Sequence, residues 1–263
     1  MSDVFVHHDG LRFRCRLDGA EGAPWLVFSN SLLTDLTMWD RPAADLAGSY
    51  RILRYDQRGH GGTDVPEAPT TIGQLAEDAA ALLHHFAVER ATFIGVSMGA
   101  ATTLCLAGRR QPRIARAIAI DGQAKAPDTA RAAWDERIAL ARTQGMAALA
   151  EATIRRWFRP DTVAARAPVL DPVRAMIVST PLDGFVACAR ALQDYDLLDL
   201  LPRIETPTLL IAGADDGTVP AAMRAMQKQI PRSTFHEIAQ AGHLPSLEQS
   251  AAFLAMVRRF LEP

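Results

Sequence analysis

The sequence predicts an α/β protein with a mostly parallel central sheet that carries helices on both faces. Short apolar runs alternate with segments whose apolar residues repeat at helical spacing, which is typical of such sheets. The alternation stops between residues 123 and 201, where the pattern is helical, and then resumes. The 263 residues suit one large α/β domain, which would bury roughly 75% of its unfolded surface.

The expected strands are short apolar runs that end at glycine, proline or polar residues. They cover residues 11–16, 25–29, 51–55, 91–96, 114–120, 206–213 and 234–238. Because the carboxyl ends of parallel strands share one edge of the sheet, where α/β folds place their sites, the loops after these strands are the ones to search for chemistry.

The expected helices begin at recognisable caps. Thr71 with Gln74 forms a capping box before an apolar face that continues to Phe86. Ser246 with Gln249 suggests a second capping box, at the start of the final helix. The other helices are expected over residues 100–110, ended by Pro112, then 221–230 and finally 247–261.

The middle segment is expected to be a helical insertion in a single α/β domain. Its helical pattern is broken at Gly145, Pro160, Pro168, Pro172 and Pro181. The predicted division is therefore a core of residues 1–122 and 202–263 with an insertion of residues 123–201. No internal repeat or low-complexity tract is visible.

Composition excludes several classes of function. The net charge of −2 argues against nucleic acid or an anionic membrane as partner. We expect neither a signal peptide nor a membrane span, since no window reaches about 18 apolar residues. Cys15, Cys105 and Cys188 are far apart, and we read them as reduced, buried thiols of a cytoplasmic protein without a metal site.

The stretch Gly95-Val96-Ser97-Met98-Gly99 places a serine between two glycines, where an apolar strand meets a helix. Flanking glycines permit a sharp turn that lifts a serine hydroxyl above the sheet, and the helix N-terminus offers free N–H groups to negative charge. The alternative is that the glycines only make a tight turn. The strand before and the helix after favour Ser97 as a nucleophile.

A serine nucleophile needs a base and an acid that orients the base. Asp215 and Asp216 both follow the strand at residues 206–213, and either could be the acid. His243 lies in the loop between the last strand and the last helix, and we predict it to be the base rather than a solvated loop histidine. His60, in a glycine-rich loop, is expected to be structural.

The developing oxyanion needs backbone donors. One should be the N–H of Met98, directly after the serine, and the other should come from the loop after the strand at residues 25–29, where Leu32 is the candidate. Each such donor is worth about 3 kcal/mol of transition-state stabilisation.

Several longer stretches show a family resemblance. They are SNSLLTDLTMWD (29–40), LRYDQRGHGGTD (53–64), GVSMG (95–99), RWFRPD (156–161), STPLDGFVACARALQDYDL (179–197) and PTLLIAGADDGTVP (207–220). The chain resembles the α/β-hydrolase superfamily over nearly its whole length, and within it the 3-oxoadipate enol-lactonase group of the β-ketoadipate pathway. The resemblance implies the α/β-hydrolase fold, with a helical cap inserted after the sixth strand, and a place in aromatic catabolism.

The resemblance also implies roles for particular residues. Ser97 becomes the nucleophile and His243 the base, and Asp216 is preferred as the acid because its spacing from Gly213 fits the superfamily pattern G-x-x-D. Leu32 falls at the oxyanion position. Trp134 and Trp157 become cap residues that either face the substrate or belong to the core.

The sequence departs from the enol-lactonase pattern at three places. Leu33 stands where the group usually has glycine, which would narrow the space near the reacting carbonyl. Ala100 replaces a second glycine after the nucleophile turn. Asp121 stands near the end of a strand where the group has a different sequence, which places it near the pocket as a second candidate for the acid.

The function expected from these observations is a cofactor-independent serine hydrolase that cleaves a lactone or small ester through an acyl-enzyme on Ser97. An oxoadipate enol-lactone carries a free carboxylate, for which the cap offers four arginines: Arg137, Arg155, Arg156 and Arg190. The same triad would serve a perhydrolase, a haloperoxidase-like enzyme or a carbon–carbon bond hydrolase. A non-catalytic ligand-binding protein on this fold is the third alternative. The oligomeric state is left open.

Overall fold

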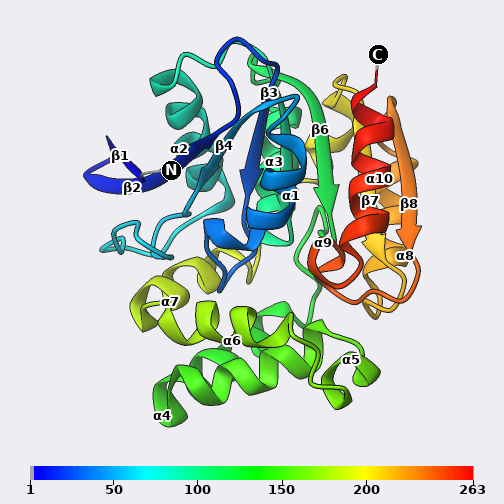
Figure 1. The fold of residues 1–263 in the computed structure, drawn as a ribbon. Helices are drawn as coiled ribbons and strands as arrows, with labels where there is room; N and C mark the ends of the chain where they lie inside the picture. Colours follow the sequence, from blue (N-terminus) through cyan, green and yellow to red (C-terminus); the bar gives the residue numbers. More distant parts are fainter. Residues whose placement is uncertain (1–2, 263) are drawn as a thin grey trace.

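A computed structural model describes residues 3–262 and contains an eight-stranded sheet in the order β1-β2-β4-β3-β5-β6-β7-β8 (Figure 1). β1 pairs antiparallel with β2, and β2 with β4, whereas the strands from β4 to β8 are parallel. The strands are β1 (Val4–His8), β2 (Leu11–Asp18), β3 (Trp25–Ser29), β4 (Arg51–Tyr55), β5 (Ala91–Val96), β6 (Ile114–Ile120), β7 (Thr208–Gly213) and β8 (Ser233–Ile238).

Helices cover both faces of this sheet. In Figure 1, α1 and α10 lie in front of the strands and contact each other, whereas α2 and α3 pack together behind them. The helices outside the insertion are η1 (Leu36–Trp39), α1 (Asp40–Leu46), α2 (Ile72–His85), α3 (Met98–Gly108), α8 (Val219–Gln227), α9 (Pro245–Glu248) and α10 (Ser250–Leu261). The predicted mostly parallel sheet between helices is therefore confirmed, although β1 was not foreseen as a separate strand.

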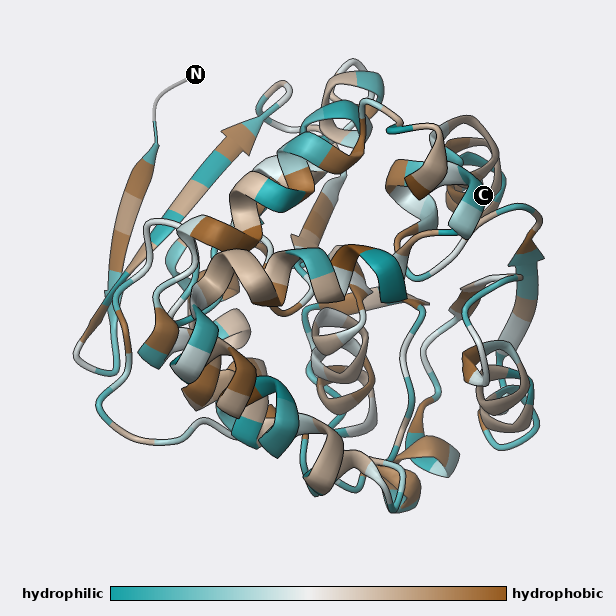
Figure 2. Cartoon of the chain, turned by 90° about the horizontal axis from the view of Figure 1, so that it is seen from below, coloured by the Kyte–Doolittle hydropathy of each residue, from teal (hydrophilic) through white to brown (hydrophobic). Residues whose placement is uncertain are grey.

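The helical insertion follows β6, as expected. It comprises α4 (Ala130–Trp157), α5 (Pro160–Ala164), α6 (Leu170–Ser179), α7 (Leu182–Ala191) and the 3-10 helix η2 (Leu198–Arg203). Gly145 has a non-helical backbone, with φ of 82° and ψ of 170°, so α4 consists of two helices joined at a kink and the expected break at Gly145 is confirmed. Helices α4–α7 lie together beyond the edge toward which β6 and β8 point (Figure 1). Apolar and polar residues alternate along them when they are seen from below (Figure 2).

The helix starts are partly corrected. The capping box of Thr71 and Gln74 is present. The capping box of Ser246 and Gln249 is wrong, because a short helix already begins at Pro245 and leaves Ser246 inside it. Gln249, with φ of −130°, then separates α9 from α10, so the final helix is two helices.

Two other helices begin earlier than expected. α8 begins at Val219, and α3 begins at Met98, directly after the serine. α3 ends at Gly108, before Pro112, because Arg110 turns into the left-handed region with φ of 54°.

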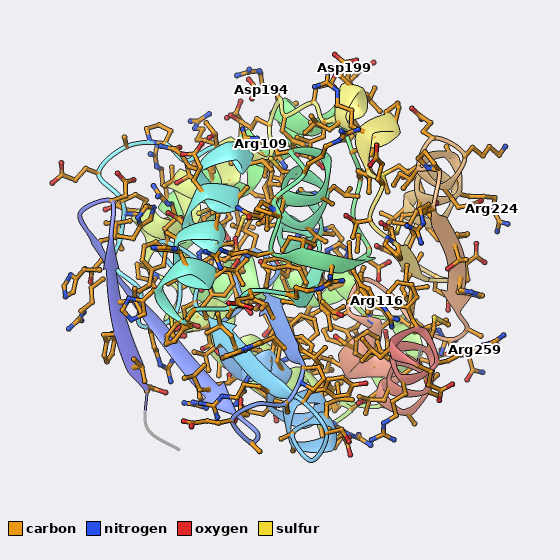
Figure 3. All side chains as sticks on the ribbon, turned by 90° about the horizontal axis from the view of Figure 1, so that it is seen from above. Arg109, Arg116, Asp194, Asp199, Arg224 and Arg259 are labelled. Carbon is orange, nitrogen blue, oxygen red and sulfur yellow. The ribbon has the colours of Figure 1, made fainter. Side chains whose placement is uncertain are left out.

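The charged side chains are spread around the molecule. Arg109, Asp194, Arg224 and Arg259 extend from its periphery in different directions (Figure 3). Within residues 3–262, no helix is both long and apolar enough to cross a membrane. The same residues contain no cluster of three or more histidine, cysteine or acidic side chains that could hold a metal. The three cysteines are buried free thiols, as expected.

Candidate active site

The turn around Ser97 is a sharp connection between β5 and α3. Ser97 has a φ of 57°, a left-handed conformation that a serine adopts only where its surroundings enforce it. A Cβ on Gly95 would lie 2.0 Å from the carbonyl oxygen of Gly99, and one on Gly99 would lie 2.3 Å from that of Ser29. Both glycines are therefore required by close backbone packing, which holds Ser97 at the tip of the turn.

Two further predicted residues meet at the same edge of the sheet. Asp216, after β7, and His243, after β8, are joined by a 2.8 Å contact between Asp216 Oδ2 and His243 Nδ1. Because an ionised carboxylate only accepts hydrogen bonds, Nδ1 carries the proton and Nε2 keeps a free lone pair. Burial alone would raise the pKa of Asp216, but the charge and hydrogen bond of His243 hold it below its usual range.

The neighbouring acid, Asp215, points elsewhere. It forms an ion pair with Arg159, with 2.8 Å between Asp215 Oδ2 and Arg159 Nε. Of the two acids left open by the sequence, Asp216 is thus the one bonded to His243.

The loop that carries His243 is held by the insertion. The His243 N–H donates to the carbonyl of Trp157 over 2.7 Å, and the two rings stack with their centroids 5.5 Å apart. Glu248 accepts from the N–H of Gly242 at 2.8 Å and from the Thr162 hydroxyl. Glu248 was not singled out by sequence reasoning, since an acid one helical turn beyond a loop carries no signal of its own.

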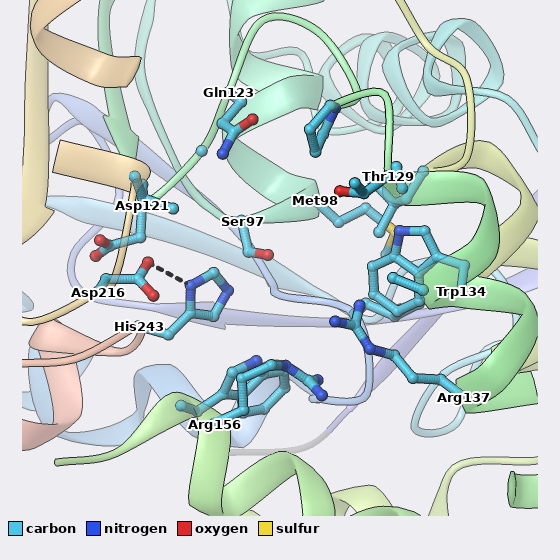
Figure 4. Close-up of a pocket in the computed structure, with 18 of the residues that line it drawn as sticks. Ser97, Met98, Asp121, Gln123, Thr129, Trp134, Arg137, Arg156, Asp216 and His243 are labelled. Atoms are coloured by element: carbon cyan, nitrogen blue, oxygen red, sulfur yellow. Dashed lines mark hydrogen bonds and ion pairs between the residues drawn. The ribbon is translucent and has the colours of Figure 1, made fainter. Parts of the chain in front are cut away.

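A cavity of about 270 Å³ opens above Ser97, between the sheet edge and α4 (Figure 4). The structure brings together most of the predicted site residues there. Those that line the cavity are Leu32, Ser97, Met98, Asp121, Trp134, Trp157, Asp216 and His243. Gln123, Thr129 and Tyr195 also line it and were missed, because a helical pattern does not tell which side chains face a neighbouring loop.

The loop after β3 is tied to the nucleophile turn by Asn30. Its side chain accepts from the Trp39 indole at 2.8 Å and donates to the carbonyl of Tyr55 at 2.9 Å. Its carbonyl accepts from the N–H of Gly99 at 3.1 Å. Leu32, two residues after Asn30, and Met98, directly before Gly99, line the same cavity. Within residues 3–262, neither the Leu32 N–H nor the Met98 N–H donates a hydrogen bond, so both are available as oxyanion donors.

Leu33 does not line the cavity, and the expectation that it narrows the pocket is wrong. It occupies the third position of a tight turn from Ser31 to Thr34, with φ of 67°. The left-handed conformation explains why a glycine suits this position, and a leucine costs about 1–2 kcal/mol there. Its side chain is buried in the hydrophobic core instead.

Ala100 faces a glycine in the structure. A Cβ on Gly122 would lie 2.5 Å from the Ala100 methyl, so the alanine fills space that the absent side chain of Gly122 leaves. The departure at Ala100 is therefore accommodated beside the site rather than within the cavity.

Two of the four arginines predicted as candidates for a substrate carboxylate line the cavity. Arg137 and Arg156 project into it from α4, across from Asp121 and Asp216 (Figure 4). Within residues 3–262 neither forms an ion pair, although Arg137 lies 4.4 Å from the Trp134 ring centroid. The surrounding protein, together with the charge of Arg137, lowers the pKa of Arg156 to about 10, which leaves it charged at neutral pH.

The other two arginines lie outside the cavity. Arg190 is bonded to Asp135 at 2.8 Å, and Arg155 is exposed on a separate surface hollow beside Arg159. The positive charge in the cavity therefore comes from Arg137 and Arg156.

Comparisons with known proteins find relatives of the same fold over nearly the whole chain. A family model described as the alpha/beta hydrolase fold matches residues 24–250. The chain is 35% identical to 3-oxoadipate enol-lactonase 2 of Acinetobacter baylyi over 92% of this chain and 91% of the relative. It is 28% identical to a putative carbamate hydrolase RutD of Pseudomonas syringae over 91% and 94% of the two chains. A crystal structure of the enol-lactonase from Burkholderia xenovorans superposes with a TM-score of 0.93, at 36% identity over 98% and 99% of the chains.

Proposed function

We propose, from the premise that the chain belongs to the α/β-hydrolase family and resembles its enol-lactonases, that it is a serine hydrolase acting on a lactone or small carboxylic ester. The observation that carries the proposal is the placement of Ser97, His243 and Asp216 around one cavity at the carboxyl edge of the sheet. The proposal needs no cofactor.

The chemistry follows from the donors and acceptors present. His243 Nε2 takes the proton of the Ser97 hydroxyl as its oxygen attacks the carbonyl carbon, and Asp216 stabilises the resulting imidazolium. The N–H groups of Leu32 and Met98 stabilise the oxyanion. The imidazolium then protonates the departing oxygen, leaving an acyl-enzyme on Ser97. Water activated by His243 hydrolyses that ester and releases the acid.

The presence of Arg137 and Arg156 in the cavity lining favours a substrate that carries a carboxylate. A guanidinium without an acidic partner at the wall of a cavity is a ready site for an anion, and arginine binds carboxylates in a bidentate manner. In this proposal the substrate's carbonyl lies at Ser97 while its free carboxylate lies against α4. This matches a lactone such as 3-oxoadipate enol-lactone, the compound in the name of the Acinetobacter baylyi relative.

Residues 123–201 would act as the cap of this site, set on a core of residues 1–122 and 202–263. Support comes from the lining of the cavity, of which Trp134 and Trp157 supply apolar surface from α4. An antiparallel bridge between Lys125 and Asp196 joins the two ends of the insertion, as expected of a unit inserted at one point.

The test is hydrolysis of 3-oxoadipate enol-lactone beside p-nitrophenyl acetate near pH 7.5, for the wild type and Ser97→Ala. Fast, Ser97-dependent loss of the lactone is the expected result. Turnover of the ester alone would retain the serine chemistry and reject the carboxylated lactone as substrate. Loss of neither would overturn the proposed function.

A further inference from the structure

A second buried carboxyl group lies beside the proposed triad. Asp121 follows β6 directly and is 1% exposed. Its N–H donates to the carbonyl of Ile211 at 2.9 Å, and its Oδ1 accepts from the N–H of Gly213 at 2.9 Å. Both bonds reach β7, the strand that leads to Asp216, so Asp121 is fixed relative to that loop.

The backbone of Asp121 is held in an uncommon conformation. Its φ is 43°, which aspartate tolerates better than most residues but does not prefer. Together with the bonds to Ile211 and Gly213, this conformation turns the carboxyl toward Asp216 (Figure 4). The remaining oxygen, Oδ2, is buried, and no hydrogen-bond donor within residues 3–262 reaches it.

Two carboxyl groups that face each other inside a protein cannot both ionise readily. Asp216 is the group of the pair that ionises more readily, because His243 Nδ1 lies 2.8 Å from its Oδ2 and Arg156 lies nearby. Asp121 has only the Gly213 N–H. Burial first, and then the charge of Asp216, raise the pKa of Asp121 well above its usual range.

The other titratable groups around the pair do not change this assignment. His243 faces Asp216 from the loop after β8, and Arg156 and Arg137 face the cavity from α4. Tyr195 donates its hydroxyl to the carbonyl of Gln123 at 3.1 Å and is not directed at either acid. No cation bonds Asp121 itself within the described chain.

We propose that Asp121 is a positioning residue that remains a neutral carboxylic acid and donates the proton on Oδ2 to Asp216. The proton stays on Asp121 throughout, and no bond to substrate is involved. Asp216 is then held from two sides, by His243 and by Asp121, so its carboxylate cannot rotate away from the imidazole. The inference rests on the proposed function, because it takes Asp216 as the triad acid.

Two substitutions test whether Asp121 acts as a hydrogen-bond donor to Asp216 or as an ionised acid. Asp121→Asn retains an acceptor for Gly213 and a donor for Asp216, and asparagine tolerates positive φ. Asp121→Gly removes the side chain and accepts the same φ without strain. With p-nitrophenyl acetate, the asparagine variant is expected to keep kcat/KM within about threefold of wild type, whereas the glycine variant loses about tenfold.

The pH profile adds a readout that a purely structural role would not move. Without the donor, Asp216 becomes more basic and stabilises the imidazolium of His243 more strongly. The acid limb of kcat/KM should therefore shift to higher pH in Asp121→Gly and stay in place in Asp121→Asn. Asp216→Asn gives the reference for loss of the triad acid. The proposal is overturned if kcat/KM of Asp121→Asn falls as far as that of Asp216→Asn, or if kcat/KM of Asp121→Gly equals that of wild type.

A second measurement does not depend on turnover. Infrared difference spectra of wild type minus Asp121→Asn at pH 7 should contain the carbonyl stretch of a protonated carboxylic acid. A carboxylate band in its place would show that Asp121 is ionised and would overturn the proposal even if the enzyme is active. If wild type hydrolyses no ester yet shows the acid band, the failure lies in the proposed function and not in the protonation of Asp121.

Discussion

The two walls of the cavity are built differently. The wall at the sheet edge consists of loops after β3, β5, β6, β7 and β8, whose backbone is fixed by close packing and hydrogen bonds. The wall from α4 presents side chains, among them Arg137 and Arg156, that have no ionic partner within residues 3–262. The protein itself holds the backbone of the sheet wall in place, whereas the α4 wall offers unpaired charge.

This difference indicates that the two walls have different functions. Groups that stabilise a transition state must be held in place before the substrate arrives, which the tight glycines around Ser97 achieve. Groups that select a substrate need free hydrogen-bonding capacity, which Arg137 and Arg156 retain. The sheet wall would therefore set the rate for any ester, and the α4 wall would set which ester is preferred.

The largest expected effect is loss of the chemistry on the sheet wall. Ser97→Ala and Asp216→Asn should each lower kcat by about 10⁴-fold or more, with lactone and ester alike, because the triad acts as a unit. Asp215→Asn is the matched control and should stay close to wild type, since Asp215 pairs with Arg159. Equal losses for both aspartate variants, in steady-state assays, would break the assignment of the acid.

A second prediction concerns His60, which lies outside both cavity walls and is fully buried in the loop after β4. Burial lowers the pKa of His60 to about 4, so the folded protein keeps it neutral while the unfolded chain binds a proton below about 6.5. Stability from this group is present above pH 6.5 and is lost as the pH falls toward 4, by about 3 kcal/mol.

Denaturant unfolding of wild type and His60→Gln at several pH values measures this effect. As the pH is lowered from 6.5 to 4, the free energy of unfolding of wild type should fall by more than that of His60→Gln. His85→Gln, at an exposed position on α2, is the control and should show no such trend. A pH-independent difference for His60→Gln would contradict the burial of a neutral imidazole.

On the α4 wall, Arg156→Gln should lower kcat/KM for a carboxylated lactone by 10- to 100-fold, in proportion to one lost charged hydrogen bond of roughly 1.5–3 kcal/mol. With p-nitrophenyl acetate, which has no carboxylate, the change should stay within about threefold. Arg155→Gln removes the same charge one residue away, outside the cavity, and serves as control. Parallel losses on both substrates would mean that the α4 wall does not select for charge.

The smallest effect is expected for Leu33→Gly. Removing the buried side chain should cost about 2–5 kcal/mol of the free energy of unfolding, and relief of the positive φ should return about 1–2 kcal/mol. The net effect is a lower melting temperature. Because Leu33 does not line the cavity, kcat/KM of the folded variant should remain within about threefold. A large change in substrate preference would show that Leu33 acts on the pocket through the Leu32 backbone.

The same contrast explains what could be predicted from the sequence. The sheet wall has local signatures, because a sharp turn requires glycines at Gly95 and Gly99 and a strand end places Asp216 at the edge. The α4 wall has none: Arg156 and Arg155 are neighbours in sequence, and only the packing of α4 decides which one enters the cavity. The error at Ser246 has a similar cause, since Pro245 starts a helix one residue before the expected cap.

Leu33 is a position where the sequence suggested an effect on the cavity that the structure does not contain. A bulky residue where a glycine is usual suggested a narrowed pocket, yet the backbone adopts the glycine-like φ of 67° and directs the side chain into the core. Sequence reasoning identified the position as unusual but could not tell a change in the cavity from a local strain.

The central claim is that Ser97 is the nucleophile of the sheet wall. The most direct test is intact-mass and peptide mass spectrometry of wild type and Ser97→Ala after exposure to a fluorophosphonate. The account predicts one covalent adduct on wild type, located on the peptide that contains Ser97, and none on the variant. An unlabelled wild type, or an adduct that persists in Ser97→Ala, would contradict it.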